Sequence, residues 1–464
     1  MTRAIKRASR AVERLFGAEV HSGEWRLVLL FFGNLFLLLA AYYILKVIRE
    51  PLILLEGGAI ERSYARGLQA GLLLLLIPGY GLLANRFEPA KLVQWIMGVF
   101  VLCVGAFVLL SRTGMHIGFA FFVWLGIFST VAIAQFWSLA NDVMTEAEGK
   151  RLFPLVAGGG TLGGIFGAQI AARLLNGDPR SLMLVAAAML LSCALLTHLT
   201  YAAAGARRVR APEAQQPARD RRGGFSLVLS DHYLLLIAVS VLILNFVNTT
   251  GDFLLAQLVN AKAHTLPHAE QGGYIAAFYG NFQTFISALT AAVQIFVVAR
   301  AFKWIGIGGS LLFLPVFALS GYATSAIVPL LGVVSAIKVV ENSADYSLQN
   351  TVQQALFLPT SRDAKYKAKA AIDTLFVRLG DLGSTGVVFL GAMLGFGVTQ
   401  YAWINVTLSG VWVFVAFRLR KLALRAAPEL AKGAIGGSAM PSTPSQKRAE
   451  HLLPSSRPAS TADS

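Results

Sequence analysis

The sequence contains little charge and little cysteine. Asp, Glu, Lys and Arg make up 14% of its 464 residues, whereas soluble chains carry about 25% charged residues. Its two cysteines, Cys103 and Cys193, both lie within apolar runs, which indicates small core residues rather than a disulfide or a metal-binding pair. The composition therefore argues against a soluble domain and against a disulfide-rich scaffold.

The signatures of common enzymes are also missing. The sequence has no P-loop, no Ser-His-Asp arrangement and no metal-ligand spacing, and His232, His264 and His268 fall in predicted loops or interfaces. A G-x-G-x-x-G run from Gly158 to Gly163 lacks the strand and βαβ unit that a dinucleotide site requires. We therefore expect no enzymatic activity, no cofactor and no bound metal.

Long apolar blocks are what the sequence has in abundance. Hydrophobic residues make up 56% of the chain, and many blocks reach the roughly 17–25 residues that cross a bilayer. The prediction is an all-α polytopic membrane protein with about twelve transmembrane helices in two six-helix halves. The predicted spans are roughly 26–46, 66–84, 92–111, 115–140, 153–175, 181–203, 232–256, 273–300, 304–322, 323–348, 370–395 and 398–420.

The spans divide the chain into five predicted parts. A basic amphipathic segment, 1–25, precedes the N-terminal half, 26–203, and a basic linker, 204–231, joins it to the C-terminal half, 232–422. The tail, 423–464, is rich in Ser, Pro, Ala and Gly and is expected to be disordered.

The basic residues predict the orientation. The net charge is +16, and Lys and Arg gather before the first span, in the linker, after the last span and in the connections that share their side. The positive-inside rule places that side, with both termini, in the cytoplasm of a bacterial inner membrane. The orientation of the protein in the membrane thereby explains the excess of basic residues. The lipid bilayer is therefore an expected partner, and nucleic acid is not.

The glycine-rich start of the fifth span predicts close helix packing. Gly159, Gly160, Gly163, Gly164 and Gly167 include three pairs at four-residue spacing, which is the small-xxx-small surface on which two membrane helices approach backbone to backbone.

Ionisable residues within spans are costly and are therefore candidate functional residues. Lys46 and Arg49 share one helix face at the end of the first span, either as interfacial anchors or as ligands for an anion. Asp142, at the end of the fourth span, either pairs with the nearby Lys150 and Arg151 or acts in gating.

The seventh span carries a polar stripe. Asn245, Asn248, Thr249 and Asp252 recur at three- and four-residue spacing on an otherwise apolar helix. Such a stripe faces either a water-filled cavity or neighbouring helices to which it hydrogen-bonds.

The tenth span also places charges on one face. Lys338, Glu341, Asp345 and Gln349 follow one another at steps of three, four and four. Lys338 and Glu341 could simply neutralise each other, but so many polar groups on one face favour the lining of a pore.

The eleventh span begins with Lys365, Lys367 and Lys369, for which plain orientation charge is the simplest interpretation. Arg378 lies deeper in the span and needs a partner, which Asp381 can supply three residues later.

Three stretches of the sequence are distinctive: "YYILKVIREPLIL", "FWSLANDVMTEAEGKRLFPLVAGGGTLGG" and "DYSLQNTVQQALFLPTSRDAKYKAKAAIDTLFVRLGD". They resemble the ATP/ADP translocase family, which includes the nucleotide exchangers of intracellular bacteria and plastids and the bacterial NTP/NDP exchange transporters. The resemblance runs over about residues 26–420 and implies a fold similar to that of the major facilitator superfamily.

The resemblance also implies roles for matching residues. The family's basic residue of the first span corresponds to Arg49, with Lys46 one turn earlier, and its acidic residue of the fourth span corresponds to Asp142, where Glu is usual. The basic residue of the Lys-x-Lys-Ala-Ala-Ile-Asp motif corresponds to Lys367 or Lys369. These positions imply cation contacts to phosphates and a charge pair that helps to switch conformation.

The chain departs from the family at several charges. The family has an acidic residue where Asn248 aligns, a basic one near Asp252, and often Lys near Asp381, while its Asp-Pro-Thr-Lys-Glu run is here "NTVQQ", residues 350–354. Because an uncompensated charge in a low-dielectric site is costly, these changes make the cavity less suited to ATP.

The sequence therefore predicts a secondary transporter that exchanges or imports a nucleotide or a related phosphorylated anion by alternating access. Lys46, Arg49, Asn248, Lys338, Lys369 and Arg378 would bind the anion, and gating or proton coupling would involve Asp142, Asp252, Glu341, Asp345 and Asp381. The alternatives are a proton-coupled carrier of a less charged solute and a non-transporting membrane scaffold or sensor. The sequence leaves the oligomeric state open and is compatible with a monomer.

Overall fold

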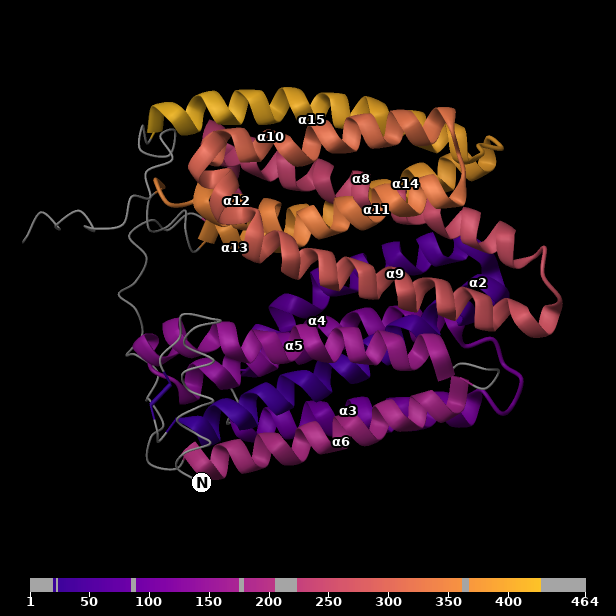
Figure 1. Ribbon diagram of the computed structural model, residues 1–464, viewed down its shortest axis with the longest axis vertical. Helices are drawn as coiled ribbons and strands as arrows, with labels where there is room; N and C mark the ends of the chain where they lie inside the picture. The colour runs from indigo at the N-terminus through magenta and orange to yellow at the C-terminus, as the bar shows by residue number, and fades with distance from the viewer. Residues whose placement is uncertain are drawn as a thin grey trace, which may run out of the picture.

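The computed structural model describes residues 20–21, 24–84, 89–174, 179–204, 223–360 and 367–426. Most of the predicted N-terminal segment, linker and tail therefore lie outside the described residues, as does Lys365. The described part consists of helices packed into two bundles, one formed by α2 to α6 and the other by α8 to α15 (Figure 1).

The first bundle begins with a long kinked helix and continues with four further helices. Its helices are α2 (Trp25–Ala84), α3 (Pro89–Leu110), α4 (Gly118–Val143), α5 (Glu146–Leu174) and α6 (Pro179–Ala204). Its core is aromatic and aliphatic and includes the fully buried Phe31, Phe121 and Phe128.

The second bundle contains two crossings that are interrupted by π-helix. Its elements are α7 (Gly224–Ser230), α8 (His232–Ala263), α9 (His268–Phe296), α10 (Val298–Ile327), α11 (Leu331–Ala344), η2 (Asp345–Gln349), α12 (Asn350–Leu356), α13 (Lys369–Ala371), η4 (Ile372–Phe376), α14 (Val377–Met393) and α15 (Val398–Ala426). A buried Trp412, whose indole nitrogen donates to the Ser240 hydroxyl at 2.9 Å, ties α15 to α8. The two π-helical segments, η2 and η4, are notable because short π segments often occur at functional sites.

The number of crossings follows from how the kinked helices are counted. By length and hydropathy, eight helices of the described part can span a membrane. Twelve crossings result when α2 is counted twice and when α11–η2–α12 and α13–η4–α14 are each counted once, together with the other long helices. The all-helical polytopic fold is thus confirmed.

Two span boundaries differ from the prediction. The first and second crossings are not separated by a long loop, because α2 continues to Gly57 and reverses at Gly58, whose φ of +70° is readily accessible only to glycine. The ninth crossing ends at Ile327 and the tenth begins at Leu331, whereas the hydropathy of this continuous apolar stretch suggested a boundary at 322.

The glycines of α5 bring two helices of the first bundle into backbone contact. A Cβ atom on Gly159, Gly163 or Gly167 would collide with a carbonyl oxygen of α2. The oxygens belong to Phe32, Phe36 and Ala40, which are spaced by four residues as the glycines are. The four-residue period on both helices therefore produces a long contact at which α5 has no room for a side chain at these three positions.

Candidate functional site

The centre of the site is a carboxylate held between two arginines of α2. The Glu50 carboxylate accepts hydrogen bonds from the guanidinium groups of Arg49 and Arg62, with 2.6 Å between Arg62 Nε and Glu50 Oε2. All three side chains are buried, and the Arg49 guanidinium lies 4.0 Å from the centre of the Phe122 ring. The reversal at Gly58 makes this possible, because it returns the chain so that Arg62 faces Glu50.

A third arginine of α2 connects the two bundles. Arg66 lies 3.6 Å from Asp252 on α8 and 3.6 Å from Asp381 on α14, and it also hydrogen-bonds to the Thr249 hydroxyl at 3.4 Å. The Thr249 hydroxyl in turn donates to Asp381 at 2.6 Å. Arg66 is therefore a cation of one bundle that is held by two carboxylates of the other.

The second bundle contains a fully buried lysine. Lys338 on α11 has no exposed surface, and its ammonium nitrogen lies 3.2 Å from Asp252 and 3.0 Å from Glu341. It also donates to the side-chain and backbone oxygens of Asn248. The Tyr322 hydroxyl donates to Glu341 at 2.8 Å, so both carboxylates that contact Lys338 have further partners.

Two predicted residues of the eleventh crossing meet as the sequence suggested. The guanidinium of Arg378 lies 3.3 Å from Asp381. Asp345 is placed differently, because it begins the π-helix η2 and its side chain forms no hydrogen bond or ion pair with any residue that the structure describes.

Lys46 lies on the part of α2 that precedes the reversal at Gly58, and it contacts neutral groups. Its ammonium nitrogen donates to the Gln283 side chain of α9 at 2.8 Å and lies 5.2 Å from the centre of the Tyr43 ring and 5.9 Å from that of Tyr42. Within the described ranges it forms no ion pair.

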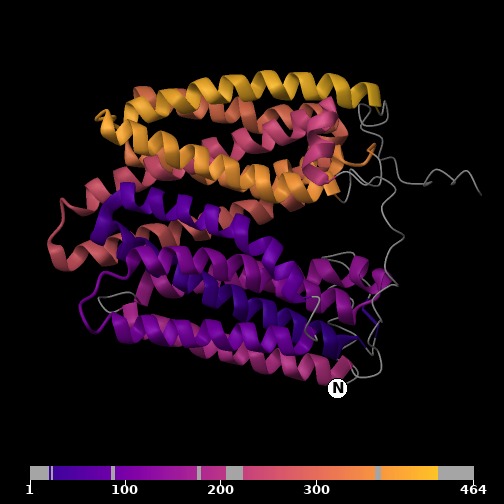
Figure 2. The ribbon, with the colours of Figure 1, turned by 180° about the vertical axis from the view of Figure 1, so that it is seen from behind.

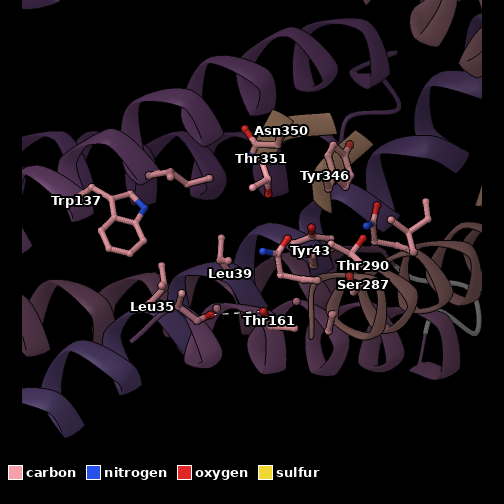
Figure 3. A pocket seen from close by; sticks show the side chains of 18 residues that line it. Leu35, Leu39, Tyr43, Trp137, Thr161, Ser287, Thr290, Tyr346, Asn350 and Thr351 are labelled. Atoms are coloured by element: carbon pink, nitrogen blue, oxygen red, sulfur yellow. Dashed lines mark hydrogen bonds between the residues drawn. The ribbon is translucent and has the colours of Figure 1, made fainter. Parts of the chain in front are cut away.

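Next to Lys46 lies a cavity of about 480 Å³ between the bundles. Tyr43 and Gln283, the contacts of Lys46, are part of its wall. Figure 3 shows Trp137 facing Tyr346 and Thr351 across the cavity, with Tyr43, Ser287 and Thr290 on another wall. The polar and aromatic lining residues are Tyr43, Trp137, Thr161, Gln283, Ser287, Thr290, Gln294, Tyr346, Asn350 and Thr351. The remaining wall is apolar and includes Gly160 and Gly164, which face side chains of α2.

The structure separates the predicted site residues into two groups. Nine lie in or beside the buried cluster between the bundles: Lys46, Arg49, Asn248, Asp252, Lys338, Glu341, Asp345, Arg378 and Asp381. The other two lie at helix ends, Asp142 near the end of α4 and Lys369 at the start of α13. Lys369 there pairs with Asp373 one turn along at 2.6 Å.

Sequence reasoning missed Arg62 and Arg66, and it did not assign Glu50 a role in the site. Glu50 and Arg62 lie between the first two predicted spans, and Arg66 is the first residue of the second. The four-residue spacing of Arg62 and Arg66, directly after Gly57 and Gly58, was the available signal for a helix that starts there.

Comparison with known proteins identifies relatives of the chain. Residues 271–422 match the family "TLC ATP/ADP transporter". "ADP,ATP carrier protein 1" of Chlamydia trachomatis is 26% identical over 346 residues, which cover 64% of this chain and 63% of that protein. The protein of the same name from Chlamydia muridarum is 24% identical, with 89% of this chain and 91% of that protein covered.

Solved structures of transporters share the fold at low sequence identity. The nucleoside transporter NupG superposes with a TM-score of 0.59 at 14% identity, covering 85% of this chain and 98% of NupG. The peptide transporter PepTSo superposes with a TM-score of 0.62 at 12% identity, covering 86% of this chain and 98% of its own. The predicted major-facilitator-like fold is therefore confirmed. The matched region and the carrier proteins of Chlamydia make the chain similar to the TLC ATP/ADP transporter family, which is a family of transporters.

Proposed function

We propose that the protein exchanges or imports a nucleotide-type organic anion across the bacterial inner membrane by alternating access. The observation that carries this proposal is the ion-paired cluster between two helix bundles, next to a cavity with walls from both. Buried charges are costly in a membrane protein and are typical of solute pathways and coupling sites. The Chlamydia relatives are ADP,ATP carrier proteins, which supports a nucleotide as the type of substrate.

The position of the contacts between the bundles supports an inward-open state of the alternating-access cycle. We define the basic end as the end at which α4, α9 and α15 finish, and the opposite end as the one at which α2 reverses. Near the opposite end the Thr385 hydroxyl donates to the Ser63 carbonyl oxygen at 3.2 Å, and the rings of Tyr64 and Phe389 lie 6.1 Å apart. Figures 1 and 2 both show the bundles spread apart toward the basic end. With that end in the cytoplasm, the state is open inward.

The cluster offers roles for both binding and switching. Lys46, Arg49 and Arg378 are the proposed ligands of the anion, because each has N–H donors from which a substrate oxygen can accept a hydrogen bond. Arg66 and its contacts to Asp252 and Asp381 cross the bundle interface, so they must break when the opposite end opens. Lys338 pairs with Asp252 of α8, and Glu341 accepts a hydrogen bond from Tyr322 of α10, so both hold together helices of one bundle.

Counter-exchange in liposomes tests the proposal. Purified protein is reconstituted with unlabelled mono-, di- or triphosphate nucleotides inside, and uptake of the labelled forms is followed. We expect saturable uptake that needs internal nucleotide and is lost in Arg49→Gln, a variant in which Glu50 retains Arg62 as a partner. Lys303→Gln, at an exposed lysine of α10, is the matched control. Folded protein that transports none of these solutes would refute nucleotide exchange.

A proton-coupled carrier is the second candidate, and Asp345 is the observation that favours it. Asp345 is half-buried at the start of the π-helix η2, and its carboxyl group has no hydrogen-bond or ion-pair partner among the described residues, so protonation there disrupts no existing pair. Under this alternative, a pH gradient drives uptake, and Asp345→Asn abolishes the response while Asp373→Asn, at the basic end, leaves it intact. The same pH response in the Asp345→Asn protein would eliminate Asp345 as the coupling group.

A further inference from the structure

The ionisable groups of the central cluster almost neutralise one another. Six cations face five carboxylates, which leaves a formal charge of +1 when all are ionised. The cations are Lys46, Arg49, Arg62, Arg66, Lys338 and Arg378, and the carboxylates are Glu50, Asp252, Glu341, Asp345 and Asp381. A solute that carries several negative charges would therefore leave the site strongly negative.

The six cations differ in whether a carboxylate contacts them. Five of the six cations lie within 3.6 Å of a carboxylate oxygen. Lys46 is the exception in the described part of the chain, since its ammonium group contacts only the Gln283 amide oxygen and two tyrosine rings. A ligand can take the place of the neutral amide at Lys46 without competing with a carboxylate, whereas at every other cation a phosphate would have to share the cation with a carboxylate that already contacts it.

The cavity beside Lys46 has a wall that suits a planar polar group. Its 18 lining residues include no charged side chain, but they do include three aromatic rings and three amides. The hydroxyl group of Thr290 in this wall is buried and has no hydrogen-bond partner among the described residues. Stacking rings and amide groups are what recognises a nucleobase, and a buried hydroxyl without a partner is stabilised when a ligand supplies one.

We propose, building on the function proposed above, that the substrate is a nucleoside with a single phosphate group. The nucleoside occupies the neutral cavity, and the phosphate replaces the Gln283 oxygen at Lys46. Nucleoside di- and triphosphates are disfavoured, because their additional charges meet only cations that are already paired, in a region of low dielectric constant.

Ligand binding to the purified wild-type protein tests this inference. Adenosine, AMP, ADP and ATP, and the corresponding guanosine, cytidine and uridine series, are titrated by calorimetry. For the recognised base we expect the monophosphate to bind at least about tenfold more tightly than either the nucleoside or the triphosphate, since a hydrogen bond to a charged group provides that factor.

Variants of Lys46 test the assignment of the phosphate. In Lys46→Gln, monophosphate affinity should fall about tenfold, to that of the nucleoside, while nucleoside affinity stays unchanged. Lys46→Arg should preserve the preference, and the exposed Lys303→Gln should match the wild type. Thermal unfolding of each variant shows whether it is folded, and the charge-preserving Arg variant keeps the test valid if the Gln variant is not.

The outcomes separate this inference from the proposed function. Tighter binding of the triphosphate, together with its exchange in liposomes, overturns the single-phosphate inference and leaves nucleotide transport standing. A monophosphate preference that survives in folded Lys46→Gln overturns the role of Lys46. Folded wild-type protein that neither binds nor transports any member of the four series overturns both proposals.

Discussion

Replacement of Arg66 by Gln should weaken the closure between the bundles without unfolding the protein. Arg66 loses two ion contacts of 3.6 Å, to Asp252 and Asp381. Neither carboxylate is left alone, because Asp252 keeps Lys338 and Asp381 keeps Arg378. The Arg66 side chain is 26% exposed, so each contact is screened and contributes about 0.5–1 kcal/mol. The sum, about 1–2 kcal/mol, corresponds to a shift of roughly 5- to 30-fold toward opening of the opposite end.

The shift can be measured as the reactivity of a cysteine at that end. Tyr64, whose ring faces Phe389 across the interface, is replaced by Cys in a protein in which Cys103 and Cys193 are replaced by Ser and Ala. A membrane-impermeant maleimide then reports how often the opposite end opens. We expect the labelling rate to rise by the factor given above when the Arg66 substitution is added.

The matched control is Arg173→Gln. This arginine lies in the last turn of α5, at the same end of the bundle, and is exposed, so its loss should not alter the labelling rate. Equal labelling rates with and without Arg66, in proteins that unfold at the same temperature, would refute the reasoning that Arg66 holds the bundles together.

Three further predictions concern stability, each measured by thermal unfolding in detergent. Gly163→Ala should be strongly destabilising because its Cβ collides with the α2 backbone, whereas Gly158→Ala, whose Cβ would meet open space, should be neutral; equal effects would contradict backbone packing. Lys338→Met should lower the free energy of unfolding by about 3–5 kcal/mol, because it leaves buried carboxylates without their cation. Adding Glu341→Gln should recover part of this loss, and no recovery would show that the pairing of Lys338 with Glu341 is unimportant. Partial burial opposes ionisation of Glu24, but hydrogen bonds from Arg151 and His21 outweigh it and lower the pKa of this carboxyl group below 4.5. The stabilisation is therefore present above pH 4.5 and is lost as the pH falls through the lowered pKa. Glu24→Gln should thus destabilise the protein at pH 7, and the difference from the wild type should shrink as the pH falls below 4.5; a pH-independent difference would contradict this.

Much of the fold was predictable because the bilayer imposes it. A span must be apolar and about 20 residues long, so apolar block length and the alternation of basic connections indicate the helices and their number. The glycines of α5 were equally readable, since a four-residue period has one meaning on a membrane helix. The helix boundaries within polar or continuously apolar stretches could not be predicted, as the reversal at Gly58 and the break after Ile327 show.

The candidate site was predictable only within single helices. Arg378 with Asp381 and Lys338 with Glu341 are pairs three residues apart on one helix, and helical periodicity alone brings them together. The partners of Asp252 lie more than 80 residues away in the chain, Arg66 on one side and Lys338 on the other. No local pattern specifies such pairs.

By itself the sequence determined that this protein is a helical membrane protein with costly polar groups in its spans, because hydrophobic length and helical period are properties of each segment. The tertiary structure decided which of those groups neutralise one another, because pairing depends on how helices far apart in the chain pack. Only that packing distinguishes Lys46, whose contacts are neutral, from the five cations that carboxylates already hold.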